Sequence, residues 1–108
     1  MGKENNDYEA EFEINKTKCS ALFDSQGHLK ELEKEIKTSE LPKSALEYCH
    51  KNFPAYKMVE TAQIIDASGK LTYEAELKKA NEHFDVIFDS KGNFLKKIEP
   101  PAKKENKG

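Results

Sequence analysis

The sequence predicts an α+β fold: an antiparallel sheet of about seven strands in the order βββ-α-ββββ, with one main helix packed on one face. Three observations lead to this prediction. One stretch of the chain occurs twice, several segments alternate between apolar and polar residues as half-buried strands do, and a single segment has helical periodicity. We therefore expect one β-meander used twice, with a helix between the copies.

The repeated stretch starts at Tyr-Glu-Ala-Glu and ends in a Phe-Asp-Ser-x-Gly turn. It runs from Tyr8 to Gly27 and again from Tyr73 to Gly92, with 65 positions between equivalent residues and no gap. This regularity indicates a single supersecondary unit used twice, as repeat units 8–37 and 73–99. The first unit looks like the last three strands of a longer unit whose helix is absent.

Each copy is predicted to be a hairpin with apolar residues on one face and mostly acidic residues on the other. Two-residue loops at Asn15-Lys16 and Ala80-Asn81 pair apolar residues only with apolar residues. The predicted pairs are Tyr8–Phe23, Ala10–Ala21, Phe12–Cys19, Tyr73–Phe88, Ala75–Val86 and Leu77–Phe84. A slip of one residue would turn every apolar side chain to the other face, so the agreement of the two copies supports this register.

Three Asp-x-x-Gly segments begin at Asp24, Asp66 and Asp89. In such a turn the aspartate accepts a hydrogen bond from the backbone two residues on, and the glycine tolerates a positive φ. Calcium binding is the alternative function. It is disfavoured because each segment carries one carboxylate, whereas an EF-hand loop uses several.

Residues 28–37 are predicted to form a third strand, with a bulge at the glycine that explains the mixed phase of its apolar residues. A helix fits the spacing of Leu29, Leu32 and Ile36 as well. The strand is favoured because the matching segment, 94–98, is too short and too close to Pro100 for a helix.

The predicted helix runs from Pro42 to Phe53, with Ser39 and Glu40 as candidate capping residues and Pro54 at its end. The helix has an apolar stripe that consists of Ala45, Leu46, Cys49 and Phe53, and this stripe is expected to cover the apolar face of the sheet. A long strand should follow the helix, over residues 56–66.

Length and composition fit a single domain, 8–99, between a flexible lead, 1–7, and a disordered tail, 100–108. The 18 basic and 20 acidic residues leave a net charge of −2, which provides no electrostatic drive toward nucleic acid. The sequence contains no long apolar run, so we expect no membrane span and no retained signal peptide.

Four segments together resemble the PepSY-like family, which is also described as beta-lactamase-inhibitor-like. They are Leu41-Pro-Lys-Ser-Ala-Leu-Glu-Tyr, Asn52-Phe-Pro-Ala-Tyr-Lys, Asp66-Ala-Ser-Gly-Lys-Leu-Thr-Tyr-Glu-Ala-Glu-Leu and Val86-Ile-Phe-Asp-Ser-Lys-Gly-Asn-Phe-Leu-Lys. The likeness covers roughly residues 8–98. It implies a small exported protein, periplasmic or secreted, with an inhibitor-like α+β fold and no catalytic residues to carry over.

No residue pattern indicates an enzyme, a metal or a cofactor. His28, His50 and His83 lack zincin spacing and are expected at the surface. An enzyme would instead need a cleft that gathers His50 or His83 with a carboxylate and a nucleophile. Cys19 and Cys49 both fall on predicted inner faces, so they are either free buried thiols or a disulfide.

The outward face of the sheet is the candidate partner-binding surface, formed by Glu9, Glu11, Glu13, Leu22, Glu74, Glu76, Asp85 and Ile87. We expect a non-catalytic protein-binding or inhibitor-like module of the bacterial cell envelope, which engages an unknown protein partner through its open sheet face, its hairpin loops or an edge strand. The acidic face would suit a basic partner. A purely solvated face is the simpler interpretation. The alternative function is a small apolar-ligand carrier with a cleft between helix and sheet around Tyr8, Tyr73 and Phe88. The oligomeric state stays open.

Overall fold

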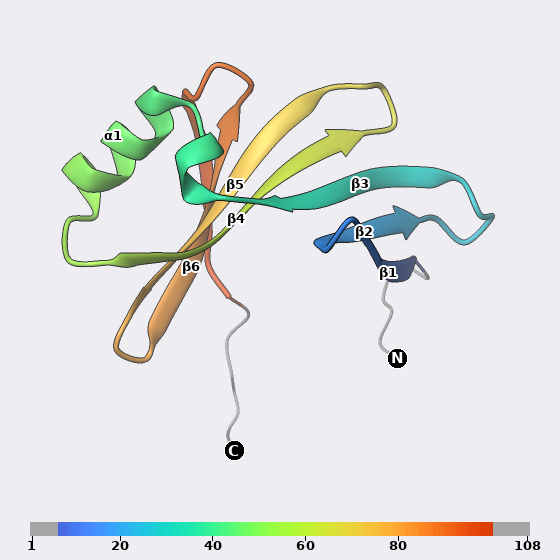
Figure 1. The fold of residues 1–108 in the computed structure, drawn as a ribbon, viewed down its shortest axis with the longest axis horizontal. Helices are drawn as coiled ribbons and strands as arrows, with labels where there is room; N and C mark the ends of the chain where they lie inside the picture. Colours follow the sequence, from blue (N-terminus) through green and yellow to red (C-terminus); the bar gives the residue numbers. More distant parts are fainter. Residues whose placement is uncertain (1–6, 101–108) are drawn as a thin grey trace.

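The computed structural model describes residues 7–100, so all of the predicted lead except Asp7 and all of the predicted tail except Pro100 lie outside the described residues. Seven strands form one antiparallel sheet in sequence order, and the helix lies between the third and fourth strands (Figure 1). The fold class predicted from the sequence is confirmed. The elements are β1 (Tyr8–Ile14), β2 (Thr17–Phe23), β3 (Leu29–Ile36), the short 3₁₀ helix η1 (Thr38–Glu40), α1 (Lys43–Asn52), β4 (Lys57–Asp66), β5 (Leu71–Lys79), β6 (Glu82–Asp89) and β7 (Phe94–Ile98).

Both hairpins have the predicted register. Tyr8 lies opposite Phe23 in the first copy, and Tyr73 lies opposite Phe88 in the second. Both residues of the first loop have positive φ, 51° at Asn15 and 68° at Lys16, whereas in the second Ala80 has φ 53°. Asparagine tolerates this conformation better than lysine or alanine, so the strained position is Lys16 in the first loop and Ala80 in the second.

The third strand of each copy carries the same irregularity. Lys30 is an extra residue between the pairs Phe23–Leu29 and Leu22–Glu31, and Leu95 is its equivalent in the second copy. The predicted bulge therefore exists, three positions beyond the glycine. The residues 28–37 form a strand rather than the alternative helix.

The two halves of the sheet are joined by β3 and β4, which pair from Glu31–Asp66 to Ile36–Thr61. The hydroxyl of the buried Thr61 donates a hydrogen bond to the carbonyl oxygen of Ile36 over 2.7 Å. The polar group at this junction is thereby satisfied, as burial requires.

The three aspartate turns have the predicted chemistry. In each, one carboxylate oxygen accepts backbone N–H groups two and four residues on, all at 2.9 Å, and the glycine has φ of 88° or 89°. These hydrogen bonds favour the charged form, and the pKa values of Asp24, Asp66 and Asp89 lie below their ordinary value.

The helix starts differently from the prediction. Ser39 and Glu40 belong to η1, where the Glu40 carboxylate accepts the backbone N–H of Lys37 over 2.8 Å, and they do not cap α1. Pro42 is the N-cap residue of α1, because its fixed φ leads directly into the first turn.

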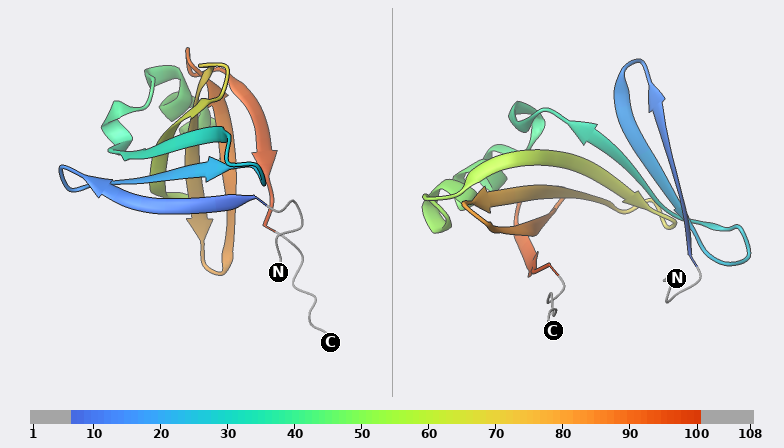
Figure 2. Two further views of the ribbon diagram at one scale, coloured as in Figure 1. Left: turned by 90° about the vertical axis from the view of Figure 1, so that its right-hand side faces the viewer. Right: turned by 90° about the horizontal axis from the view of Figure 1, so that it is seen from below.

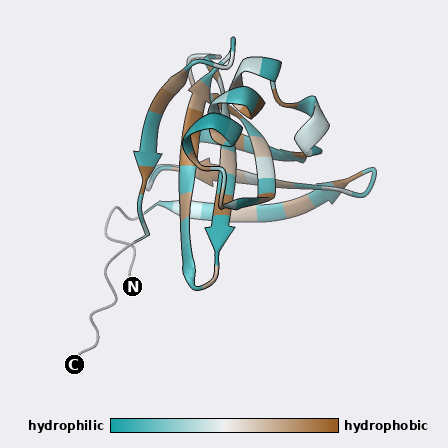
Figure 3. Ribbon diagram, turned by 90° about the vertical axis from the view of Figure 1, so that its left-hand side faces the viewer, coloured by the Kyte–Doolittle hydropathy of each residue, from teal (hydrophilic) through white to brown (hydrophobic). Residues whose placement is uncertain are grey.

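The apolar stripe of α1 packs mainly on the second copy of the repeat, and Ile36 at the end of β3 and Met58 of β4 also pack against this core. The hydrophobic segments of the strands, brown in Figure 3, lie behind the helix. At the start of α1, the Ser44 hydroxyl donates to the carbonyl oxygen of Lys91 over 2.8 Å and ties the helix to the β6–β7 turn. The buried core consists of Leu41, Ala45, Cys49, Ala75, Leu77, Phe84, Val86 and Phe88.

The expectation that α1 covers the apolar face of both copies is wrong. Every residue of β1 is exposed, including Tyr8 at 58%. In Figures 1 and 2, α1 lies at one end of the sheet and the β1–β2 hairpin at the other. A ten-residue helix is about 15 Å long, whereas seven strands span roughly 30 Å across the sheet, so one such helix cannot cover both copies.

The two cysteines are free, so the disulfide considered above does not form. Cys19 lies on the first copy, where α1 does not reach, whereas Cys49 is a buried residue of α1 itself and packs into the core over the second copy. Burial raises the pKa of the Cys49 thiol to about 11, which keeps it protonated at neutral pH.

Candidate functional site

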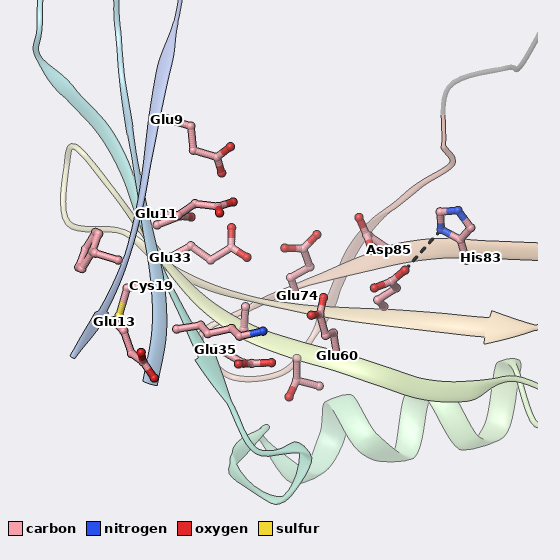
Figure 4. A pocket seen from close by; sticks show the side chains of 16 residues that line it. Glu9, Glu11, Glu13, Cys19, Glu33, Glu35, Glu60, Glu74, His83 and Asp85 are labelled. Atoms are coloured by element: carbon pink, nitrogen blue, oxygen red, sulfur yellow. Dashed lines mark ion pairs between the residues drawn. The ribbon is translucent and has the colours of Figure 1, made fainter. Parts of the chain in front are cut away.

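An acidic basin lies on the face of the sheet opposite α1 (Figure 4). Its volume is about 670 Å³. The twist of the sheet turns the carboxylates of β1 and β3 toward those of β4, β5 and β6 across this hollow. The acidic residues that line it are Glu9, Glu11, Glu13, Glu33, Glu35, Glu60, Glu74, Glu76 and Asp85.

Six of the predicted face residues line the basin: Glu9, Glu11, Glu13, Glu74, Glu76 and Asp85. The two apolar members do not. Leu22 and Ile87 lie on the same face, opposite Glu9 and Glu74 respectively, but outside the lining of the basin. Ile87 is only 8% exposed, so it offers little surface to a partner.

Sequence reasoning missed Glu33, Glu35 and Glu60. Because of the bulge at Lys30, the sequence did not show which residues of β3 share a face. A further bulge, at Val59 in β4, places Glu60 on the acidic face opposite Glu76. The alternation of Glu31, Glu33 and Glu35 with Leu32 and Lys34 was the available signal.

Crowding of the carboxylates changes their proton affinity. Burial raises the pKa of Glu74 to about 8, and a hydrogen bond to Asp85 and the charges of Asp85, Glu33 and Glu31 add to this effect. The pKa values of Glu33 and Glu60 are raised as well, first by burial and then by neighbouring carboxylates. At neutral pH Glu74 is therefore mostly protonated.

Two basic side chains accompany these acids. Lys18 lines the basin, and its charge partly offsets the rise in the pKa of Glu60. The Nδ1 atom of His83 lies 3.5 Å from a carboxylate oxygen of Glu76 at the rim. Within residues 7–100, no group of three or more His, Cys, Asp or Glu side chains is arranged to hold a metal ion.

The other histidines lie elsewhere. His28 is in the first aspartate turn, with Nδ1 3.3 Å from Asp24, and His50 is exposed on α1 on the other side of the sheet. The structure therefore brings only His83 to the basin.

The predicted apolar cleft between helix and sheet is filled by side chains. Phe88 is fully buried, and Tyr48 packs edge-on against it with ring centroids 5.8 Å apart. Phe53 and Phe84 are in similar contact at 4.9 Å. Tyr8 is on the other copy of the repeat, so the three rings proposed for a ligand cleft do not meet.

Solved structures with the same fold come from three Bacteroides species. A DUF2874 family protein from Bacteroides uniformis has a TM-score of 0.77 at 14% identity, covering 91% of this chain and 74% of that one. A structure described as putative periplasmic proteins from Bacteroides eggerthii has 0.77 at 14%, with 91% and 73% covered. A DUF2874 family protein from Bacteroides ovatus has 0.75 at 11%, with 91% and 72% covered.

At these identities the likeness establishes the fold alone. No curated protein matches the chain. In the part of the chain that the structure describes, no helix is long and apolar enough to cross a membrane. The family model described as "Putative beta-lactamase-inhibitor-like, PepSY-like" matches residues 6–96, and this family is not a known enzyme family. The chain therefore belongs to the PepSY-like family.

Proposed function

We propose that this protein is a non-catalytic binding module of the bacterial cell envelope, periplasmic or secreted, that holds a basic segment of a protein partner in the acidic basin. The family description as inhibitor-like and a fold relative described as periplasmic support this proposal. Inhibitors and interaction modules act through a shaped surface and need no catalytic group.

The gathering of nine acidic side chains around one hollow is the observation that carries the proposal, and the pKa of Glu74, raised by burial and then by its acidic neighbours, agrees with it. Carboxylates that repel one another reduce the stability of the free protein, and this is an arrangement that a lysine or arginine side chain would relieve. A guanidinium can bond two carboxylate oxygens at once, so arginine fits a surface of paired acids best. Ionisation of Glu74 accompanies binding, and affinity should therefore increase as the pH rises toward 8.

A titration with a ten-residue peptide of alternating lysine and arginine tests the proposal. The variant Glu74→Gln/Glu76→Gln should bind the peptide at least tenfold more weakly than the unaltered protein. Glu47→Gln/Glu99→Gln is the matched control, because it changes the net charge equally at exposed positions outside the basin. An equal loss in both variants would mean that net charge alone attracts the peptide.

The natural partner can be sought by capture from a cell-envelope extract. A protein retained by the unaltered chain should be released by the charge-reversed variant of Glu9, Glu11, Glu74 and Glu76. Unchanged capture would remove this face as the binding surface.

A further inference from the structure

The first copy of the repeat presents an apolar face that no part of residues 7–100 covers. Six large apolar side chains on this face are 38–58% exposed. With roughly 200 Å² per side chain, they leave about 500 Å² of apolar surface in contact with water, the size at which such patches mark interaction sites. We call this surface the open face; its residues are Tyr8, Phe12, Ile14, Leu29, Leu32 and Ile65.

The second copy shows what this surface is shaped to accept. Equivalent positions carry similar side chains, as in the pairs Ala10–Ala21 and Ala75–Val86. The next pair also contains one phenylalanine in each copy, although on different strands: Phe12 on β1 lies opposite Cys19, and Phe84 on β6 lies opposite Leu77. Over the second copy lies an amphipathic helix, which approaches closely because its buried contact residues, Ala45 and Cys49, are small.

The first copy also lacks the strand that accompanies this helix. In the second copy β5 pairs with β4, which follows α1 directly in the chain. Among the described strands, the equivalent strand, β1, has β2 as its one neighbour and lies at the end of the sheet order. In the second copy, α1 covers the apolar face and β4 covers the edge of β5, and both elements belong to one segment, 43–66. In the first copy, the equivalent face and edge are both open among the described residues.

We propose that the open face binds an amphipathic helix of about ten residues from a protein partner, with small side chains at the centre of its apolar stripe. Lys34 lies on this face, opposite Cys19, so an acidic residue beside that stripe would complete the fit. A second copy of this chain fits less well. The open face supplies about 500 Å² where a stable dimer buries roughly 800 Å² per partner, and a face-to-face dimer would bury Lys34 of both copies.

A peptide with the sequence of residues 38–56, with Cys49→Ala to remove the thiol, is a suitable probe because it contains the helix that fits the equivalent face. It is titrated into the ¹⁵N-labelled full chain. We expect saturable changes in amide shifts on β1, β2 and β3. Phe12→Glu/Ile14→Glu should weaken binding at least tenfold, and a peptide that also carries Ala45→Glu should not bind.

Leu95→Glu is the matched control, because Leu95 is 45% exposed, close to the 38% of Phe12, but lies on the second copy outside the open face. It should leave binding unchanged. Absence of saturable shifts would overturn the proposal, as would shifts on β5 and β6, which would mean that the peptide displaces α1. A concentration-dependent dimer that Phe12→Glu abolishes would assign the face to a second copy instead. Phe12 also lines the acidic basin, whereas Ile14 does not, so the single variant Ile14→Glu keeps the two proposals apart: it should weaken binding of the helical peptide and leave binding of the basic peptide unchanged.

Discussion

The two copies of the repeat have the same strand register, the same aspartate turn and the same bulge, yet they contribute differently to the molecule. β5 and β6 bury Ala75, Leu77 and Val86 under α1, whereas β1 leaves all seven of its residues exposed. The difference teaches that this supersecondary unit specifies its own shape, while its role in stability depends on what packs against it. The second copy contributes most of the core, and the first leaves its apolar face exposed.

Truncating equivalent apolar side chains to alanine should give the largest difference between the copies in the free energy of unfolding. Leu77→Ala removes a side chain that is 2% exposed and should reduce the free energy of unfolding by about 3 kcal/mol. Phe12→Ala, at the equivalent place in the first copy, should cost about 1 kcal/mol because Phe12 is 38% exposed. Urea denaturation measures both. Equal losses would mean that the first copy is covered in solution.

Replacing the turn glycine with alanine should also destabilise the second copy more than the first, because α1 packs against the turn of the second copy. An added Cβ at Gly92 would lie 2.2 Å from the Ser44 hydroxyl oxygen and 2.7 Å from Cβ of Pro42, where α1 begins. Gly92→Ala should therefore cost about 3 kcal/mol, from this clash and from a φ of 89°. Gly27→Ala meets no atom within 4 Å and should cost about 1 kcal/mol, from the φ alone. Thermal unfolding of the two variants provides the comparison.

The acidic positions should differ in their response to pH. Since the folded state raises the pKa of Glu74 from 4.5 to about 8, its contribution favours folding below pH 4.5 and is lost as the pH rises to 8. Glu74→Gln should remove this dependence and stabilise the protein at pH 8 by about 1–3 kcal/mol, after allowance for solvent screening.

The control for this prediction is Glu9→Gln, at the equivalent and exposed position in the first copy. It should leave the pH profile of unfolding close to that of the unaltered protein. A steep profile that survives Glu74→Gln would show that another carboxylate holds the proton.

Glycine substitutions in the two hairpin loops should give the smallest difference in the free energy of unfolding between the copies. Ala80→Gly should stabilise the protein by about 0.5–1 kcal/mol, because glycine adopts the positive φ of this position without strain. Asn15→Gly should be nearly neutral, since asparagine already tolerates its φ of 51°. Chemical denaturation of the two variants tests this. A destabilised Ala80→Gly variant would mean that entropy of the unfolded chain outweighs the relief of strain.

Much of the fold could be predicted from the order of the residues alone. Alternation gave the register of Tyr8 with Phe23 and of Tyr73 with Phe88, because a strand has a side-chain period of two. The aspartate turns followed from residue chemistry that acts over four positions. The capping of α1 was predicted incorrectly, since Pro42 rather than Ser39 or Glu40 sets its start.

The candidate site was predictable in part. The six basin carboxylates on β1, β5 and β6 lie in regular alternation, and local pattern was enough to place them on one face. Glu33, Glu35 and Glu60 follow bulges, and a single extra residue reverses the face of all that come after it. The mixed phase of residues 28–37 indicated a bulge in that strand but not its exact position, and the bulge at Val59 was not predicted.

The sequence by itself determined which residues share a face of each hairpin, because that depends only on neighbours along one strand and across one loop. The tertiary structure decided that α1 covers one copy and leaves the other open, and that the twist of the sheet gathers the acids of β1, β3 and β5 into one basin. Both outcomes depend on the width and curvature of seven strands together, and these dimensions exist only once the whole sheet has formed.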